Sequence, residues 1–264
     1  MKYQLIVSTM EQKDDSIYNK MNISSDAIII NQSDCFEINE TQKDGNTLKM
    51  YTFKERGIGL SRNSGMMRAD ADIIQFADDD MIFTDTYKED VINEFKNHPE
   101  ADIILFSLQS LNPDRPLIKI DKFSRVSKKE ALKYGCARLA ARREKLVYNN
   151  ITFSLLFGGG AKYGSGEDTI FLQDCIKAGL RVYKSPVKVA DVKQDESSWF
   201  NGYTEKYYED KGALFRAALP YLCYVYAIVS AIKSSSKNYS KKEILKFYLN
   251  GIKLYKSKQR GAKK

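Results

Sequence analysis

Short apolar runs alternate with helix-like stretches over the first 110 residues of the chain. Four runs have the length and composition of buried strands, at residues 3–7, 27–30, 73–77 and 101–108. Residues 57–71 have the pattern of a loop that leads into a helix. Strands joined by helical connections predict an α/β fold, in which helices cover both faces of a mostly parallel sheet.

The pattern is less regular in the following part of the chain. Residues 117–126 are expected to form an irregular hairpin, followed by a basic helix. A glycine-rich loop at 157–166 precedes a helix that begins near Glu167 and ends at Gly179. Residues 180–183 resemble a last strand.

Polar residues directly follow three of the predicted strands. They are Ser8 and Thr9, Asn31 to Asp34, and Asp78 to Asp80. Ligands of parallel α/β sheets bind beyond the carboxyl ends of the strands, so all three groups are candidate ligand-binding residues.

The acidic triplet at 78–80 predicts a site for Mn²⁺ or Mg²⁺. These ions prefer oxygen ligands and bridge readily to a diphosphate. In an extended chain Asp78 and Asp80 would point to the same side, where two carboxylates can share one ion. An acidic turn that caps a helix is the structural alternative.

Composition indicates a globular protein that needs no disulfide bond or structural metal to fold. A chain of 264 residues with 43% hydrophobic residues can bury a sizeable core. Its four cysteines lie far apart without a C-x-x-C pair, which argues against a zinc site or a redox motif. The start of the chain does not resemble a signal peptide, so we expect a reducing, cytoplasmic compartment.

Positive charge is concentrated at the end of the chain. Residues 233–264 contain eleven Lys and Arg and one acid, and therefore carry +10, while the other 232 residues carry −2. A change in composition at Lys211–Gly212 predicts one domain over residues 1–212 and a helical basic tail over 213–264. The basic segment matches no recognised nucleic-acid-binding module, so no nucleic-acid partner is expected.

Two interpretations of the tail remain open. Residues 217–232 are mostly apolar but fall short of the ~20 residues that span a bilayer. Residues 241–258 place apolar side chains at helical intervals opposite lysines. This pattern suits a cationic amphipathic helix lying on an anionic membrane, and equally a helical hairpin docked on the protein with a solvated lysine face.

Three motifs in order resemble family 2 glycosyltransferases with the GT-A fold, of the bacterial capsular or exopolysaccharide type. They are ERGIGLSRN at 55–63, the triplet at 78–80, and Gly166-Glu167-Asp168 at the start of a predicted helix. The resemblance covers residues 1–212. It implies a Rossmann-like, mostly parallel central sheet and a nucleotide-sugar donor.

The resemblance implies roles on the donor side of the site. Asp80 is expected to bind the Mn²⁺ or Mg²⁺ ion. Asp78 and Asp79 are expected to contact the ribose and the water shell of the metal. Arg62 and Asn63 match the pair that orients the nucleotide sugar.

It also implies residues for the base and the acceptor. Thr9 and the stretch from Asn31 to Asp34 match positions that line the base pocket. Asp168 matches the catalytic base, and Glu167 matches a neighbour that contacts the acceptor. Helix capping is the structural alternative for these two acids.

One family feature is missing from the expected place. Many relatives supply a late histidine as a metal ligand, whereas the only histidine here is His98, in a connection between predicted elements. Asp191 or Asp195 could substitute, or Asp80 could hold the metal together with phosphates and water.

The sequence therefore predicts an inverting, metal-dependent glycosyltransferase. It is expected to move a sugar from a nucleoside-diphosphate donor, with UDP as the expected nucleotide, to a hydroxyl of a growing, lipid-linked surface polysaccharide. Peripheral contact with the inner face of an anionic cell membrane would suit that acceptor. A sugar nucleotidyltransferase and a non-catalytic module that binds cations or carbohydrate are the alternatives.

Overall fold

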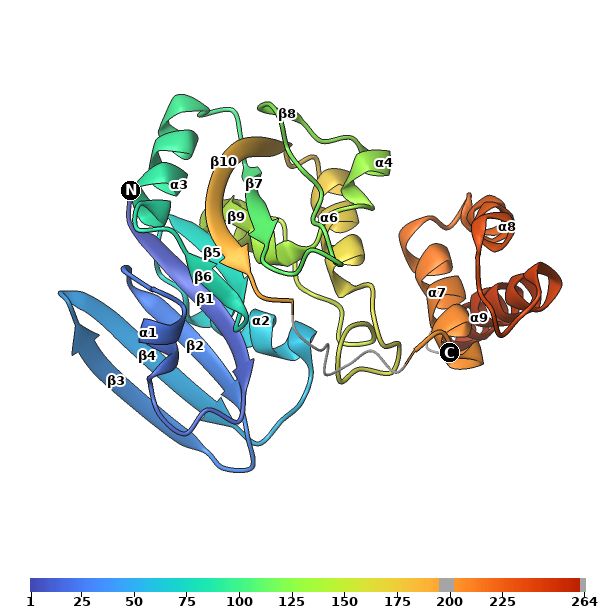
Figure 1. The fold of residues 1–264 in the computed structure, drawn as a ribbon, viewed down its shortest axis with the longest axis horizontal. Helices are drawn as coiled ribbons and strands as arrows, with labels where there is room; N and C mark the ends of the chain where they lie inside the picture. The colour runs from blue at the N-terminus through green and yellow to red at the C-terminus, as the bar shows by residue number, and fades with distance from the viewer. Residues whose placement is uncertain (195–201, 262–264) are drawn as a thin grey trace.

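A computed structural model describes residues 1–194 and 202–261, with side chains up to residue 256 (Figure 1). The strands are β1 Tyr3–Met10, β2 Ala27–Gln32, β3 Glu37–Lys43, β4 Asn46–Phe53, β5 Ile73–Asp78, β6 Met81–Phe83, β7 Ile103–Ser110, β8 Ser124–Arg125, β9 Leu139–Arg142 and β10 Val182–Val192. The α-helices are α1 Ile17–Lys20, α2 Ile58–Arg68, α3 Tyr87–Asn97, α4 Lys128–Ala131, α5 Arg143–Tyr148, α6 Glu167–Lys177, α7 Glu205–Ala218, α8 Cys223–Lys233 and α9 Lys241–Gly261. A 3₁₀ turn, Cys136–Arg138, precedes β9.

All the described strands belong to one sheet, ordered β3-β4-β2-β1-β5-β9-β7-β10-β6, with β8 paired beside β10. The predicted strands at 3–7, 27–30 and 73–77 are confirmed as β1, β2 and β5. β1 pairs in parallel with both of its neighbours, and β2 pairs in parallel with β4. The register places Thr9 opposite Asn31 and Ser8 opposite Asp78. The expected α/β fold is confirmed, and the polar residues after the strands meet at one edge.

Helices cover both faces of this sheet, which explains the unbroken apolar runs of its central strands. On one face, Leu5 and Val7 of β1 pack with Tyr18 of α1 and Phe95 of α3. On the other face, Ile6 packs with residues of α2, α5 and α6. Side chains of β1 alternate between two hydrophobic cores, and both cores need apolar residues.

Several elements differ from the sequence-based expectations. β9 is antiparallel to β5 and β7 and lies between them. Residues 117–126 do not form the expected hairpin, because only β8 is a strand there and it pairs with β10. The expected strand at 180–183 continues to Val192, with register shifts between Lys184 and Ala190. Pro186 falls in this interval and lacks the N–H that a regular ladder requires.

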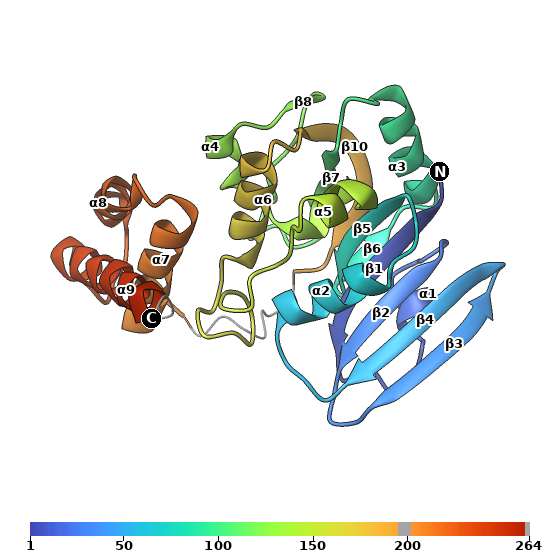
Figure 2. The same ribbon diagram turned by 180° about the vertical axis from the view of Figure 1, so that it is seen from behind.

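The last three helices form a bundle at the opposite end of the molecule from β3 and β4 (Figures 1 and 2). Ile244, Phe247, Tyr248 and Ile252 of α9 are buried in a core shared with α7 and α8. The periodicity of 241–258 therefore reflects a helix docked on its neighbours, which is the second of the two interpretations left open by the sequence. Residues 212 and 213, where the tail was expected to begin, lie within α7.

No helix among residues 1–194 and 202–261 is long and apolar enough to cross a membrane.

Candidate active site at the carboxyl ends of β1 and β5

Helix α2 carries Arg62 at the centre of its buried face, where the side chain is 3% exposed. Glycines stand three residues away on either side. A Cβ atom at Gly59 would lie 2.6 Å from the Ser154 carbonyl oxygen, and one at Gly65 would lie 2.3 Å from the Ile6 side chain. Only glycine permits this close approach, which clamps Arg62 between β1 and the loop at 153–154.

Arg62 joins the end of β5 to the start of α6. Its Nη2 donates to Asp78 Oδ1 at 2.9 Å, and its Nη1 donates to Asp168 Oδ1 at 2.5 Å. Nη1 also lies 3.5 Å from Glu167 Oε1. Burial alone would lower the pKa of Arg62, but the negative charges of Asp168 and Asp78 hold it well above its usual value. The structure thus brings together three of the expected site acids around one buried cation.

Glu167 is the more enclosed of the two acids that open α6. Its side chain is 13% exposed, against 25% for Asp168. Burial raises the pKa of Glu167 to about 7, and the charge of Asp168 adds to this effect while Arg62 opposes it. The glycine-rich loop makes room for the carboxylate, since a Cβ at Gly158, which has a φ of +108°, would lie 2.9 Å from it.

The acidic triplet does not continue as an extended strand. β5 ends at Asp78, and Asp79 and Asp80 form a turn that leads into β6. The expectation that residues 78 and 80 point the same way by strand alternation is therefore wrong. Asp79 instead accepts a 2.5 Å hydrogen bond from Thr9 Oγ1, which ties β1 to the turn.

Asp80 has the chemistry of a cation ligand. Burial, together with the negative charges of Asp78 and Asp79, raises its pKa to about 6. No described lysine or arginine forms an ion pair with Asp79 or Asp80. The described residues contain no group of three His, Cys, Asp or Glu that could hold a metal ion. One carboxylate with phosphate and water ligands fits the way Mg²⁺ is usually bound.

The other candidate metal ligands do not complete such a group. His98 stacks on Phe123 with ring centroids 3.5 Å apart. Asp191 is paired with Lys188 at 2.9 Å. Asp195 lies outside the described residues.

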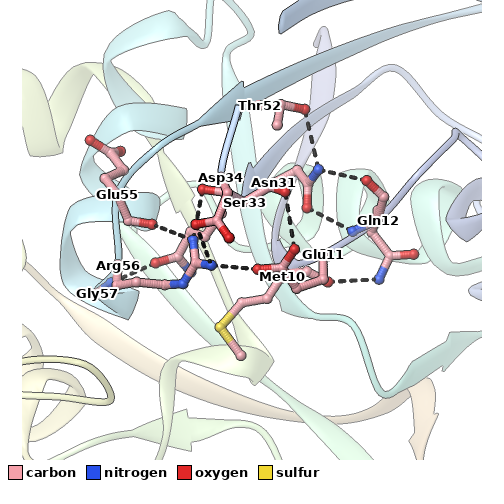
Figure 3. A network of polar contacts seen from close by, with 11 residues as sticks. Met10, Glu11, Gln12, Asn31, Ser33, Asp34, Thr52, Glu55, Arg56 and Gly57 are labelled. Atoms are coloured by element: carbon pink, nitrogen blue, oxygen red, sulfur yellow. Dashed lines mark hydrogen bonds and ion pairs between the residues drawn. The ribbon is translucent and has the colours of Figure 1, made fainter. Parts of the chain in front are cut away.

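The candidate base-binding residues gather where β1, β2 and β4 end (Figure 3). Asn31 is fully buried, and its side-chain amide bonds to both backbone groups of Gln12 and to Thr52. It therefore positions the segment after β1. An adjacent cavity of about 500 Å³ is lined by Gln12 and Ser33 among others.

Arg56 also stabilises the segments that follow β1 and β2. Its guanidinium donates to the Ser33 carbonyl oxygen and pairs with Glu11 (Figure 3). Asp34 lies 3.5 Å from Arg56 and its side chain is 87% exposed, so it stands at the rim of the network.

Asn63 follows Arg62 in α2, but its side chain bonds to the backbone of Phe153. Its amide donates to the Phe153 carbonyl oxygen at 2.9 Å and accepts from the Phe153 N–H at 2.8 Å. The ring of Phe153 lies 5.3 Å from the Arg62 guanidinium. Asn63 thus fixes the loop that covers Arg62.

A family model described as glycosyl transferase family 2 matches residues 36–154. This segment is identified as part of a family 2 glycosyltransferase domain. The matched segment includes Arg62 and the acidic triplet, while Asp168 lies beyond it. A search of curated proteins finds no match.

Solved structures place the glycosyltransferase in the GT-A fold. The structure of S. aureus TarS 1–349 in complex with UDP-GlcNAc superposes with a TM-score of 0.60 at 16% identity, covering 95% of this chain and 72% of that one. TarS 1–349 in complex with UDP gives 0.58 at 18% identity, covering 95% and 71%. Longer TarS gives 0.57 at 16% identity, of which this chain covers 43%.

Two residues of the glycosyltransferase site carry no signal in the sequence. Cys136 is fully buried beside Asp168; burial raises the pKa of its thiol well above the usual value, and the negative charge of Asp168 raises it further. A Cβ at Gly135 would lie 3.1 Å from Asp168 Oδ2. Both residues shape the surroundings of Asp168, and only the three-dimensional structure brings them there.

Proposed function

We propose that the enzyme transfers a sugar, with inversion, from a nucleoside-diphosphate donor to a hydroxyl of a growing, lipid-linked surface polysaccharide of capsular or exopolysaccharide type. One observation carries this proposal: Arg62 bonds to Asp78 on the donor side and to Asp168 on the acceptor side. A single rigid cation therefore sets the geometry between the two halves of a transfer reaction.

The donor is proposed to be a UDP-sugar lying along the ends of β1 and β5. TarS, which shares the fold, is the protein whose structures contain UDP-GlcNAc and UDP. The base would lie near Thr9, Asn31 and Asp34, and Asp78 and Asp79 would contact the ribose. Asn31 would act by fixing the backbone of Gln12 and Thr9 by fixing Asp79, since these are the groups to which their side chains bond.

Asp80 is proposed to hold Mn²⁺ or Mg²⁺ against the donor phosphates. Such an ion stabilises the charge that develops on the leaving diphosphate. The fit rests on the carboxylate itself, which is partly buried beside two other acids without a described cation partner. Arg62 donates to Asp78 and would add a fixed positive charge to the same region.

On the acceptor side, Asp168 is proposed to take the proton of the attacking hydroxyl. Its Oδ1 is held by Arg62, while Oδ2 faces the space that Gly135 leaves free of a side chain. Glu167 is proposed to contact the acceptor from the same helix turn. Attack from the face opposite the leaving diphosphate inverts the anomeric carbon.

The proposed location follows from the acceptor. A lipid-linked polysaccharide would bring the enzyme to the inner face of the cell membrane, as a cytoplasmic protein in peripheral contact with it. The solvated lysines of the tail helices suit an anionic surface.

The test compares Asp80→Ala and Asp168→Asn. UDP with Mn²⁺ should raise the melting temperature of the wild type and of Asp168→Asn, but not that of Asp80→Ala. Asp168→Asn should lose turnover by at least about 10²-fold, the usual contribution of a general base. Asp121→Ala, an exposed acid, and Asp174→Asn, on the same helix as Asp168, are the matched controls.

Product analysis separates the alternatives. Release of UDP supports glycosyl transfer, whereas release of pyrophosphate would identify a nucleotidyltransferase. Full cation-dependent turnover by Asp80→Ala would refute the metal assignment.

A further inference from the structure

Helix α8 buries small side chains and exposes bulky apolar ones, which is the reverse of the usual arrangement in a water-soluble helical bundle. Its buried residues are the small ones, Cys223, Ala227 and Ala231, which are spaced by four and face α7 and α9. Its bulky apolar residues point outward: Tyr224, Val225, Ile228, Val229 and Ile232 are between 43% and 59% exposed. The neighbouring helix α9 does the opposite and buries its bulky residues.

The exposed apolar surface continues into the turn before α8. Tyr221 is 96% exposed and Leu222 is 51% exposed. We call these two residues and the five outward residues of α8 the α8 face. Soluble proteins rarely leave so many adjoining bulky apolar side chains in water, and such patches usually mark an interaction surface.

The positive charge around α8 indicates which kind of partner the α8 face binds. Between Asp210 and Glu243 the chain has no acidic residue, but it has six basic ones: Lys211, Arg216, Lys233, Lys237, Lys241 and Lys242. Lys233 ends α8, and the exposed lysines Lys237, Lys241 and Lys242 follow it along the chain. An apolar face followed by lysines complements an anionic lipid surface.

A cavity at the carboxyl end of α8 adds polar groups to this border. It measures about 660 Å³ and is lined by Ser230, Lys233, Lys237, Tyr208 and Tyr248 among others. Hydroxyl and ammonium groups in one cavity suit the phosphate of a lipid headgroup.

We propose that the α8 face inserts into the headgroup region of an anionic bilayer, with α8 lying in the plane of the membrane. With 11 residues the helix is too short to span the ~30 Å hydrocarbon core. A second copy of the chain is a poorer occupant, because two α8 faces in contact would bring both lysine-rich segments together. The inference deepens the proposed function by assigning its membrane contact to α8.

The test is co-sedimentation of the full chain with vesicles of phosphatidylcholine alone or mixed with phosphatidylglycerol. The wild type should bind the anionic vesicles, and added salt should weaken this binding. Val225→Asp/Ile228→Asp should lower the affinity by at least about tenfold, since two apolar side chains no longer leave water. Lys233→Ala/Lys237→Ala should weaken binding to anionic vesicles only.

Ile38→Asp is the matched control. It makes the same change at a side chain that is 56% exposed on β3, at the other end of the molecule, and should bind vesicles as the wild type does. Sugar transfer to a water-soluble acceptor should stay unchanged in all these variants. That measurement keeps failure of the membrane inference distinct from failure of the proposed reaction.

Three results would overturn the inference. The first is unchanged vesicle binding by Val225→Asp/Ile228→Asp, and the second is no vesicle binding by the wild type. The third is a lipid-free dimer that the same substitutions convert to a monomer, which would assign the α8 face to a second copy of the chain.

Discussion

Arg62 illustrates how one residue can determine a site. Its guanidinium is buried and bonds to Asp78 and Asp168, and its Nε is among the few buried polar atoms without a partner in the described structure. The motif resemblance predicted that Arg62 belongs to the site. It could not reveal that Arg62 links the two acids, because their separation in the sequence says nothing about their distance in space.

Replacing Arg62 should harm both stability and activity. Arg62→Met leaves the partly buried carboxylates of Glu167 and Asp168 without their cation, and we expect the free energy of unfolding to fall by about 3–5 kcal/mol. Arg62→Lys keeps a charge but cannot form the two-sided fork, so we expect better stability with low turnover. Urea denaturation and kcat check both statements. Equal kcat for Arg62→Lys and wild type would refute the linking role.

Glu167 should make stability depend on pH in an unusual direction. Its pKa is raised from 4.5 to about 7, so the folded protein holds a proton that the unfolded chain releases between these values. Stability contributed by this proton is present below pH 4.5 and is lost as the pH rises to about 7. The melting temperature of the wild type relative to Glu167→Gln should therefore fall from pH 5 to pH 8. A constant difference would contradict the raised pKa.

At the scale of elements, the sequence correctly predicted the strands whose two faces are both buried. β1, β2 and β5 are buried on both faces and appear as unbroken apolar runs. β3 is almost entirely exposed and polar, and β9 is only four residues long, so neither has a distinctive pattern. For α9 the helical spacing of apolar residues correctly predicted a helix, but the same apolar face could pack on a bilayer or on a neighbouring helix. Only tertiary packing distinguishes these outcomes.

The contact between α7 and α9 depends on two glycines. A Cβ at Gly251 would lie 1.9 Å from the Glu209 carbonyl oxygen, and one at Gly212 would lie 2.1 Å from that of Tyr248. The change in composition at Lys211–Gly212 therefore falls at a helix crossing inside α7, where the two backbones touch.

Gly251→Ala should consequently destabilise the protein, although alanine favours helices by about 1 kcal/mol over glycine. Overpacking against a backbone oxygen should exceed that gain and leave a net loss of about 1–3 kcal/mol. Denaturation followed by circular dichroism measures it, with Lys253→Ala, an exposed residue of the same helix, as the control. A more stable Gly251→Ala would show that α7 and α9 do not meet at this point.

At the scale of the whole molecule, the helical bundle and the active site are mechanically connected. Ala213 and Leu214 of α7 pack with Phe157 and Tyr163 of the glycine-rich loop. The same loop faces Glu167 through Gly158. The segment first expected to be an appendage thus supports the loop beside Glu167 and Asp168, the acids proposed to act on the acceptor, while the α8 face points to a proposed membrane contact.

Asp210 provides a direct test of this connection. It is 9% exposed, and its Oδ2 accepts from the Gly164 N–H at 2.9 Å and from Lys206 Nζ at 2.7 Å. A hydrogen bond to a charged group contributes about 1.5–3 kcal/mol, so Asp210→Ala should speed exchange of the Gly164 amide hydrogen by roughly 10–100-fold. The loop should then hold Glu167 less firmly, and kcat should fall while affinity for UDP with Mn²⁺ stays the same. Glu205→Ala, in the first turn of the same helix, controls for a general effect on α7. If exchange at Gly164 rises and kcat does not change, the bundle stabilises the loop without helping to position the acids, and its contribution to function lies at the α8 face alone.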